Sequence, residues 1–513
     1  MRKRRFDRST GRNGRSLPSA LGACLVVILA AAGSFGCAPP PAAQPKVDTL
    51  RLGIRDAREA RRVFTPFLFA DRLIAINWQG KPVEVLATSW QWKDNDRTLQ
   101  LQLRQGVTFH DGTPLTASVV ADILQQLKQG DPRRTFPLVT SFDAVDDQTL
   151  AVRLSRPDAF LVEAIADTWI VDPRKPDIGT GPYKLLARIP SVIGERNASY
   201  FRGTPGINRI ELIFFDTPRA SWVALMKGEV DMVQEVNRES AEFLEGASHV
   251  EMSSTIRPFY IPLVFNVHHP ILKNVEVRRA LAEAINRDEI VQQAMRGHGR
   301  VADDPVWPFH WAYNAEARKY SHNPNAARLR LDAAGFRMRP SPVPGGMASR
   351  FSIRCVFWND PQFERIALLL QRQLAEVGID LVLEGASESE LTSRAYRGDF
   401  DTYLYQLTSG KSFDWTYRFW HSPAAGVWMQ NSGYTGVDSV LERLRTVRPD
   451  PEIRAAVADL RERFYEDVPA AFLAWPETTR AIDARFDVGE QSGPDIFANL
   501  WKWRPAGSLQ ATR

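Results

Sequence analysis

Apolar residues recur along this chain with two different spacings, and the two spacings alternate. In Arg97–Leu103 the leucines fall on every second position, which is the pattern of a half-buried strand. In Pro114–Gln129 the apolar residues return every three or four positions, which predicts a helix with Thr116 as its N-cap. The same patterns predict the strand Asn208–Phe215, the helix Ala220–Lys227, the helix Pro361–Val377 and the strand Ile379–Leu383. This alternation of strands and helices predicts an α/β architecture.

Two further apolar segments are extended in character and interrupted by proline, Phe259–Val267 and Ala471–Ala484. Such segments suit strands that leave one sheet and enter another. We therefore expect two lobes, with the chain passing out to the second lobe and returning to the first.

The first 36 residues are unlike the rest, because a basic head precedes an apolar run that is too short for a comfortable membrane span. We predict an export signal over residues 1–36. The run ends in Ser34-Phe35-Gly36-Cys37, which resembles a lipoprotein processing box whose cysteine takes a diacylglycerol. Ser34 stands where an aliphatic residue is usual, so an ordinary cleavage site near Cys37 is the alternative. Residues 37–47 are rich in Pro and Ala, as expected of a tether.

The net charge of +5 belongs to this leader, which holds seven Lys or Arg residues and one Asp. The remainder of the chain has 58 basic and 59 acidic residues. A nucleic acid or other polyanion partner is therefore not supported.

The three cysteines, Cys24, Cys37 and Cys355, provide no disulfide framework. A bond between Cys37 and Cys355 is the one pairing open to the mature chain, and lipid on Cys37 would exclude it.

The pair His110-Asp111, in the segment GVTFHDGTPL, could be an acid/base couple, a pair of metal ligands or a corner of the fold. No convincing nucleophile accompanies it, and the sequence contains no G-x-S-x-G, no H-E-x-x-H and no spaced Cys/His array. Gly410-Lys411-Ser412 imitates the end of a phosphate-binding loop, but Tyr405 stands at the position of the required first glycine. We expect no catalytic residue, no metal and no cofactor.

Many short motifs follow one another along the chain: Leu86–Trp90, Leu103–Ala117, Gly179–Tyr183, Arg196–Phe201, Lys227–Asp231, Phe265-Asn266, Val277–Leu281, Ala284–Arg287 and Leu374–Ile379. Their order over nearly the whole mature chain resembles the extracellular solute-binding proteins of family 5. That family includes dipeptide-, oligopeptide- and nickel-binding components of ABC importers.

The resemblance implies a two-lobed periplasmic-binding-protein type II fold with mixed sheets and a hinge. Lobe I would comprise residues 48–262 and the return segment 475–513, and lobe II residues 263–474. We expect the hinge near Phe265-Asn266 and Ala474-Trp475. In such proteins the corner at His110 joins a strand to a helix and is structural.

The resemblance also implies a function without catalysis: capture of a peptide-like or other small solute and its delivery to the permease subunits of an ABC importer. We expect a monomer at the periplasmic or outer cell surface, held to the membrane by lipid on Cys37. Two alternatives stay open, a secreted hydrolase that uses cleft carboxylates and a ligand receptor for a membrane sensor.

For the ligand site we predict Trp358, Asn359, Tyr405, Lys411, Asp414 and Trp415. In the peptide-binding members that this chain resembles, an aspartate after an "FDxxL" segment pairs with the ammonium group of the peptide. Counting from Asp401 puts Gly410 at that position. We therefore expect recognition of a free amine to be lost unless Asp414 substitutes, and a neutral or anionic solute to be favoured, with Lys411 as donor and Trp415 as stacking surface.

Overall fold

The computed structural model describes residues 48–55, 65–130, 136–236, 241, 243–244, 246–340, 348–422, 430–489 and 496–507. The expected export signal, the tether and Cys37 lie outside the described residues. Those described belong to one compact unit.

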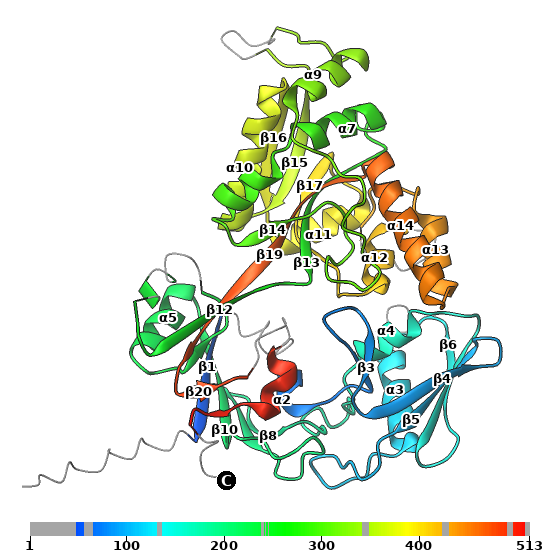
Figure 1. The fold of residues 1–513 in the computed structure, drawn as a ribbon, viewed down its shortest axis with the longest axis vertical. Helices are drawn as coiled ribbons and strands as arrows, with labels where there is room; N and C mark the ends of the chain where they lie inside the picture. The colour runs from blue at the N-terminus through cyan, green and yellow to red at the C-terminus, as the bar shows by residue number, and fades with distance from the viewer. Residues whose placement is uncertain are drawn as a thin grey trace, which may run out of the picture. The chain divides into compact units, whose positions relative to one another are not determined.

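A mixed sheet of thirteen described strands runs through this unit, in the order β16-β15-β17-β13-β19-β11-β1-β10-β9-β8, with β12 and β14 also paired to β19 and β18 to β13 (Figure 1). Parallel pairs, such as β1 with β10 and β15 with β16, stand beside antiparallel ones. The strands are β1 Thr49–Arg55, β8 Tyr183–Ala187, β9 Val192–Arg196, β10 Arg209–Phe215, β11 Met232–Val233, β12 Val250–Ile256, β13 Phe259–Phe265, β14 Gly299–Val301, β15 Phe351–Trp358, β16 Ile379–Ala386, β17 Thr402–Leu404, β18 Leu407–Thr408 and β19 Ala470–Asp483.

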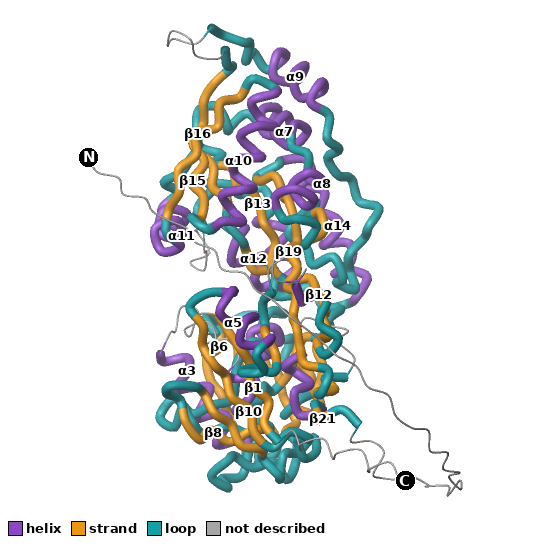
Figure 2. Tube along the Cα trace, turned by 90° about the vertical axis from the view of Figure 1, so that its left-hand side faces the viewer, coloured by secondary structure: helices purple, strands orange, loops and turns teal. Residues whose placement is uncertain are grey.

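Strand β19 is continuous through both halves of this sheet. Its first residues pair with β13, from Ala470 opposite Val264 to Ala474 opposite Ile261. Its last residues pair with β12, from Glu477 to Asp483. The two strands β13 and β19 run side by side (Figure 2). The extended, proline-interrupted segments are therefore strands of one sheet, and they join its two halves.

The other described strands form smaller sheets. A four-stranded antiparallel sheet has the order β4-β5-β7-β6, and β2 pairs with β3 and β20 with β21. Their bounds are β2 Ile74–Ile76, β3 Pro82–Glu84, β4 Ala87–Lys93, β5 Thr98–Leu103, β6 Val139–Ala144, β7 Thr149–Leu154, β20 Phe486–Asp487 and β21 Arg504–Pro505.

The helices include the three that the sequence predicts, with shifted ends. They are α2 Thr65–Phe69, α3 Ala117–Gly130, α4 Leu161–Ala166, α5 Pro218–Met226, α7 Val275–Ala284, α8 Arg287–Glu289 continued by the π-helix η2 Ile290–Ala294, α9 Pro324–Ala333, α10 Pro361–Glu376, α11 Glu388–Arg397, α12 Phe413–Trp420, α13 Asp438–Thr446, α14 Asp450–Asp467 and the 3₁₀ helix η4 Ile496–Lys502.

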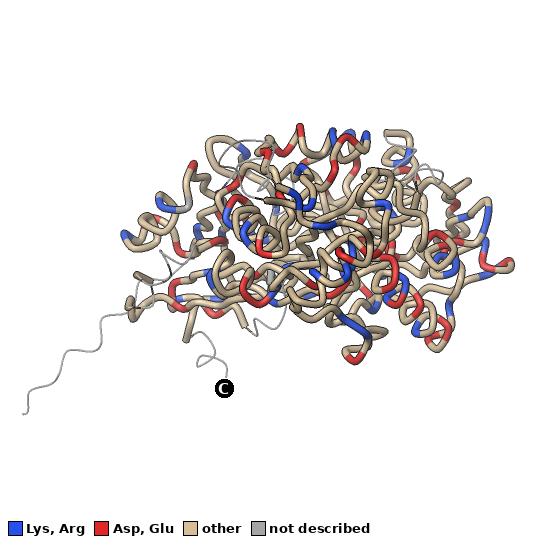
Figure 3. The backbone as a smooth tube through the Cα atoms, turned by 90° about the horizontal axis from the view of Figure 1, so that it is seen from above, with Lys and Arg blue, Asp and Glu red and all other residues tan. Residues whose placement is uncertain are grey.

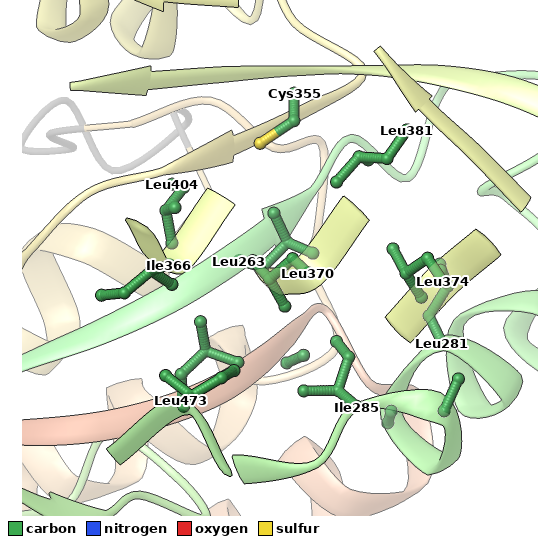
Figure 4. Close-up of a cluster of buried hydrophobic side chains, with 14 of the residues drawn as sticks. Leu263, Leu281, Ile285, Cys355, Ile366, Leu370, Leu374, Leu381, Leu404 and Leu473 are labelled. Carbon is green, nitrogen blue, oxygen red and sulfur yellow. The ribbon is translucent and has the colours of Figure 1, made fainter. Parts of the chain in front are cut away.

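Helix α10 shows why the apolar spacing was a reliable guide. The Asp360 side chain accepts the backbone N–H of Gln362 and so caps the helix, while Gly378 follows its end with φ of +84°. The predicted face, which includes Ile366 and Leu370, is buried against β13, β15 and β16 (Figure 4). The helix prediction for this segment is confirmed.

The start of α3 differs from the prediction by three residues. We predicted a helix from Pro114, but Pro114 forms an isolated bridge with Thr108 and the helix begins at Ala117. Thr116 caps it as expected, since its Oγ1 accepts the N–H of Val119 at 3.4 Å. Because Pro114 is paired with Thr108 in this bridge, its backbone is not helical, and the helix begins only after it.

Charged residues of both signs are interspersed along the described backbone (Figure 3). No described helix combines the length and the apolar character needed to cross a membrane.

Candidate functional site

A cavity of about 370 Å³ lies beside the β2–β3 hairpin, within the size range of small-molecule sites. Its walls come from α2, the hairpin and η4, together with Trp169, Tyr200 and Arg202. Among the described lining residues, Lys411 alone comes from residues 263–474. Of the described residues, those of one part of the chain therefore build the cavity, and Lys411 reaches it from the other part.

Backbone geometry directs Lys411 toward this cavity. Lys411 has φ of +62° and the preceding Gly410 has φ of +63°, so the chain turns through two left-handed residues between β18 and α12. A Cβ on Gly410 would lie 2.2 Å from Cδ1 of Trp415, which makes glycine the fitting residue there. The Lys411 ammonium is buried and donates to the Ile76 carbonyl at 3.1 Å.

One wall of the cavity is polar. Asp71 is buried, and its carboxyl accepts hydrogen bonds from the hydroxyls of Tyr200 at 2.8 Å and Thr180 at 2.9 Å. Burial raises the pKa of Asp71, and the two hydroxyl bonds oppose that rise. Its neighbour Arg72 has its guanidinium carbon 4.1 Å from the ring centroid of Trp169 and 5.5 Å from that of Phe67.

The tip of the β2–β3 hairpin docks onto residues 307–311. The Trp78 ring meets the Trp307 ring edge to face at 4.6 Å, and Trp307 Nε1 donates to the Trp78 carbonyl at 2.8 Å. The Trp311 N–H donates to the Gln79 carbonyl at 2.9 Å, and the Lys81 ammonium lies 3.4 Å from the Trp311 ring centroid. This hairpin tip is a direct contact between residues 48–262 and residues 263–474.

A second contact of this kind involves helices α4 and α12. The Glu163 carboxylate accepts the backbone N–H groups of Phe413 at 3.3 Å and Asp414 at 2.7 Å, at the N-terminus of α12. Burial and the neighbouring Asp414 raise the pKa of Glu163 to about 8. Close by, Arg445 forms two hydrogen bonds to the carboxylate of Asp158, and both side chains are buried.

Of the six residues that we predicted for ligand binding, Lys411 lines the cavity and the other five do not. Trp358 ends β15 and packs edge to face on Tyr405, with ring centroids 5.7 Å apart. The Tyr405 hydroxyl donates to the Glu388 carboxylate, and the Asn359 N–H donates to the Ala386 carbonyl at 2.8 Å. These three residues form a group within residues 263–474, and they do not line the cavity.

Asp414 and Trp415 bond to other residues rather than facing the cavity. Arg418 Nε donates to the Asp414 carboxylate at 2.8 Å, one turn along α12. Trp415 Nε1 donates to Asp167 at 3.0 Å, and its ring stacks on Phe419. Both residues therefore contribute to the contact between α12 and α4.

Sequence reasoning missed most of the cavity. Trp78, Trp169, Arg72 and Trp501 were not singled out, because single aromatic and cationic residues in unrelated segments carry no pattern. A signal existed for the hairpin: the turn Asn77-Trp78-Gln79-Gly80 lies between two short β-prone stretches, and the Asn77 side chain accepts the N–H groups of Gln79 and Lys81.

The corner at His110 is structural, as the resemblance implied. His110 Nδ1 accepts the Gly179 N–H at 3.4 Å, so its Nε2 carries the proton and donates to the Gly181 carbonyl at 3.0 Å. Burial lowers the pKa of His110, which keeps the ring neutral. The Asp111 carboxylate accepts the Thr113 N–H at 3.1 Å. The described residues contain no group of three or more His, Cys, Asp or Glu arranged to hold a metal ion.

Comparison with known proteins identifies the fold. The model of "Bacterial extracellular solute-binding proteins, family 5 Middle" matches residues 81–426. The oligopeptide-binding protein AppA of Bacillus subtilis is 22% identical over 454 residues, which is 82% of each chain.

Solved structures of similar proteins match most of this chain. The substrate-binding protein CtaP of Listeria monocytogenes has a TM-score of 0.77 and 22% identity, covering 90% of this chain and 99% of its own. NikZ of Campylobacter jejuni, in complex with Ni(L-His), has a TM-score of 0.74 and 19% identity, covering 89% of this chain and 99% of its own. The two-lobed type II binding-protein fold is confirmed. The chain belongs to the bacterial extracellular solute-binding proteins of family 5.

Proposed function

We propose that this chain, a solute-binding protein of an ABC importer, holds its solute in the cavity beside the β2–β3 hairpin and delivers it without chemical change. The observation that carries this proposal is that the described lining residues come from both parts of the chain: Lys411 comes from residues 263–474, and the others come from residues 48–262 and 475–513. A solute in the cavity would touch both parts of the chain. It would then favour the closed arrangement by its differential affinity for that state, and the permease would read that state.

The proposed lobes are residues 48–262 with 475–513, and residues 263–474. The chain crosses between them at the junction of β12 with β13 and within β19, so we move the first proposed hinge point from Phe265-Asn266 to Arg257-Pro258. Phe265 is fully buried and pairs with Thr402 of β17, which leaves it no freedom to act as a hinge. Around Trp475 the partners of β19 change from β13 to β12, which supports the second hinge point.

Attachment to the membrane is part of the proposal. The small-residue box before Cys37 and the Pro- and Ala-rich residues 37–47 support a lipid anchor followed by a tether. The protein would then act as a tethered monomer outside the cytoplasm, close to its permease.

The function is tested by denaturing the purified protein and identifying the released small molecules by mass spectrometry. Each released compound is returned to the emptied protein, and binding and chemical integrity are followed together. We expect reversible binding of an unchanged solute. A compound that is converted to a product would favour the secreted hydrolase.

The site is tested with matched tryptophan variants. Ala75→Trp adds a ring to the cavity wall and should abolish binding, whereas Ala144→Trp makes the same change on an exposed residue of β6 and should leave binding intact. Equal binding by both folded variants would exclude this cavity as the solute site.

A further inference from the structure

The β2–β3 hairpin is anchored at its base in one hydrophobic cluster and packs with its tip on another. At the base, Ile74 is buried in a cluster that residues 48–262 build. At the tip, Trp78 packs against a second cluster, which contains Trp307 and comes mainly from residues 263–474. The hairpin therefore connects the cores of the two proposed lobes.

The hairpin tip is shaped by its own hydrogen bonds. The Asn77 side chain accepts the N–H of Gln79 at 3.0 Å and that of Lys81 at 2.9 Å. The Asn77 N–H in turn donates to the Lys81 carbonyl at 2.9 Å. These bonds do not involve residues 263–474, so we expect the tip to keep its shape when the lobes separate and to dock as a preformed unit.

The same hairpin borders the cavity. Ala75, Ile76 and Val83 line it, and so does Trp78. The Trp78 ring also meets the Trp307 ring edge to face at 4.6 Å, and Trp307 is not among the described lining residues. A solute that contacts Trp78 would therefore touch the residue that joins the hairpin tip to the other proposed lobe.

Gly80 shows how closely the tip fits its docking site. Gly80 has φ of +75°, and a Cβ there would lie 2.3 Å from His310 Cδ2 and 2.9 Å from the Lys411 carbonyl oxygen. The His310 ring is itself held, because its Nδ1 accepts the Ala312 N–H at 3.1 Å and it packs edge to face on Phe413 with ring centroids 4.7 Å apart. A side chain at position 80 would therefore oppose docking of the tip.

We propose that Trp78 couples solute binding to lobe closure: a solute in the cavity contacts Trp78 and so holds the hairpin tip in its docked position against Trp307 and Trp311. This rests on the proposed function. When the cavity is empty, Trp78 loses its contact on that side and the tip leaves its docking site more readily. The solute thus favours the closed arrangement through the hairpin.

Gly80→Ala tests the docking step without altering a described lining residue of the cavity. Gly106→Ala is the matched control, because Gly106 has φ of +74° and an added Cβ there would meet open space. Both variants carry the same backbone strain, and only Gly80→Ala meets the other proposed lobe. We expect Gly80→Ala to bind solute about tenfold or more weakly than Gly106→Ala, with an equal melting temperature of the empty proteins.

The probe is the extract of small molecules released from the denatured parent protein, added back from one stock to each emptied variant. Titration calorimetry gives the affinity, and small-angle scattering gives the compaction. Hydrogen exchange follows the Trp311 N–H, which donates to the Gln79 carbonyl at 2.9 Å when the tip is docked. We expect the extract to compact the parent protein and to protect the Trp311 N–H, and both effects to be smaller in Gly80→Ala.

A second pair of variants keeps the test open if Gly80→Ala does not fold, as judged by circular dichroism. Trp311 is not a described lining residue, and the Lys81 ammonium lies 3.4 Å from its ring centroid. Trp311→Leu removes this partner of the hairpin tip and should weaken binding of the extract. Trp222→Leu makes the same change within residues 48–262, where Trp222 stacks on Phe243, and should bind as the parent protein does.

The proposal is overturned if the folded variants at Gly80 and Trp311 bind the extract as tightly as their controls. It is also overturned if the extract binds the parent protein without protecting the Trp311 N–H. In both cases the parent protein still releases and rebinds a solute, which supports the proposed function. An extract with no compound that rebinds the parent protein would instead overturn the proposed function together with this inference.

Discussion

Replacing Asp158 with asparagine tests whether the contact between the two proposed lobes is part of solute binding. Arg445 donates to the two carboxylate oxygens of Asp158, from Nε at 3.0 Å and from Nη2 at 2.9 Å. The side chains of Asp158 and Arg445 are 8% and 7% exposed, respectively. Asp158 precedes α4 and Arg445 lies on α13, so the pair joins the two proposed lobes.

The free-energy cost of Asp158→Asn follows from the burial of the pair. Removing one partner of a buried ion pair costs about 3–5 kcal/mol, because the remaining charge stays out of water. We take about 3 kcal/mol, since Arg445 keeps the Tyr417 ring at 4.8 Å and asparagine retains one acceptor. When the lobes separate, water solvates Arg445, and the penalty then falls on the closed state alone. Because the solute binds the closed state, Asp158→Asn should weaken binding by about 100-fold.

The assay is titration calorimetry with a solute released from the parent protein, beside thermal unfolding without solute. We expect weaker binding and a nearly unchanged melting temperature of the empty protein. Asp143→Asn is the matched control, because its pair with Arg153 is exposed at 42% and 52% and contributes little.

Two results would refute this reasoning. A melting temperature lowered by several degrees with normal binding would mean that the pair lies inside one rigid body. Normal binding and normal melting together would mean that the buried pair stabilises neither state.

Three further outcomes are expected. Cys37→Ala should leave the protein unprocessed or released into the soluble fraction, and full processing with unchanged membrane attachment would exclude the lipid site. The pKa of Glu163 is about 8 in the folded chain and 4.5 ordinarily, so the Glu163 side chain ionises at lower pH in the unfolded chain, and the stability of the fold should decrease as pH rises from 4.5 to 8. Glu163→Gln should make the stability measured in urea titrations less dependent on pH over this range. The same pH dependence in both proteins would contradict this expectation. Gly410→Ala should lower the free energy of unfolding by about 3 kcal/mol, because strain at positive φ adds to a clash between the new Cβ and Trp415. Gly106 has φ of +74° with open space around it, so Gly106→Ala should lower the free energy of unfolding by about 1 kcal/mol. Equal losses in the two variants would show that the clash with Trp415 is relieved.

Local patterns in the sequence determined the helices, strands and turns whose formation depends on residues close to one another in the chain. The leucines of Thr98–Leu103 and the apolar face of Pro361–Glu376 predict a strand and a helix, since the side-chain period follows from backbone geometry alone. The corner from Gly106 to Thr116 was equally readable, because its glycine turn, Asx bond and N-cap all act within a few residues. The family motifs that carried the functional class lie in such local units.

The cavity was decided by tertiary structure. Arg72, Trp169 and Trp501 are far apart in the chain, and no periodicity connects them before the sheet and η4 bring them together. Trp415 illustrates the same limit: the sequence offers it as a stacking surface for the solute, and in the fold its Nε1 donates to Asp167.

Lys411 could be predicted from a local feature of the sequence, but its position in the cavity depends on the tertiary structure. The departure from the family pattern at Gly410-Lys411 is visible in the residues themselves. That its ammonium reaches Ile76, more than 300 positions earlier, depends on the docking of the β2–β3 hairpin against Trp307 and Trp311. A sequence specifies which side chains are present and the local turn that carries them. Long-range packing decides which of these side chains line the same cavity and therefore which charged groups lie together there.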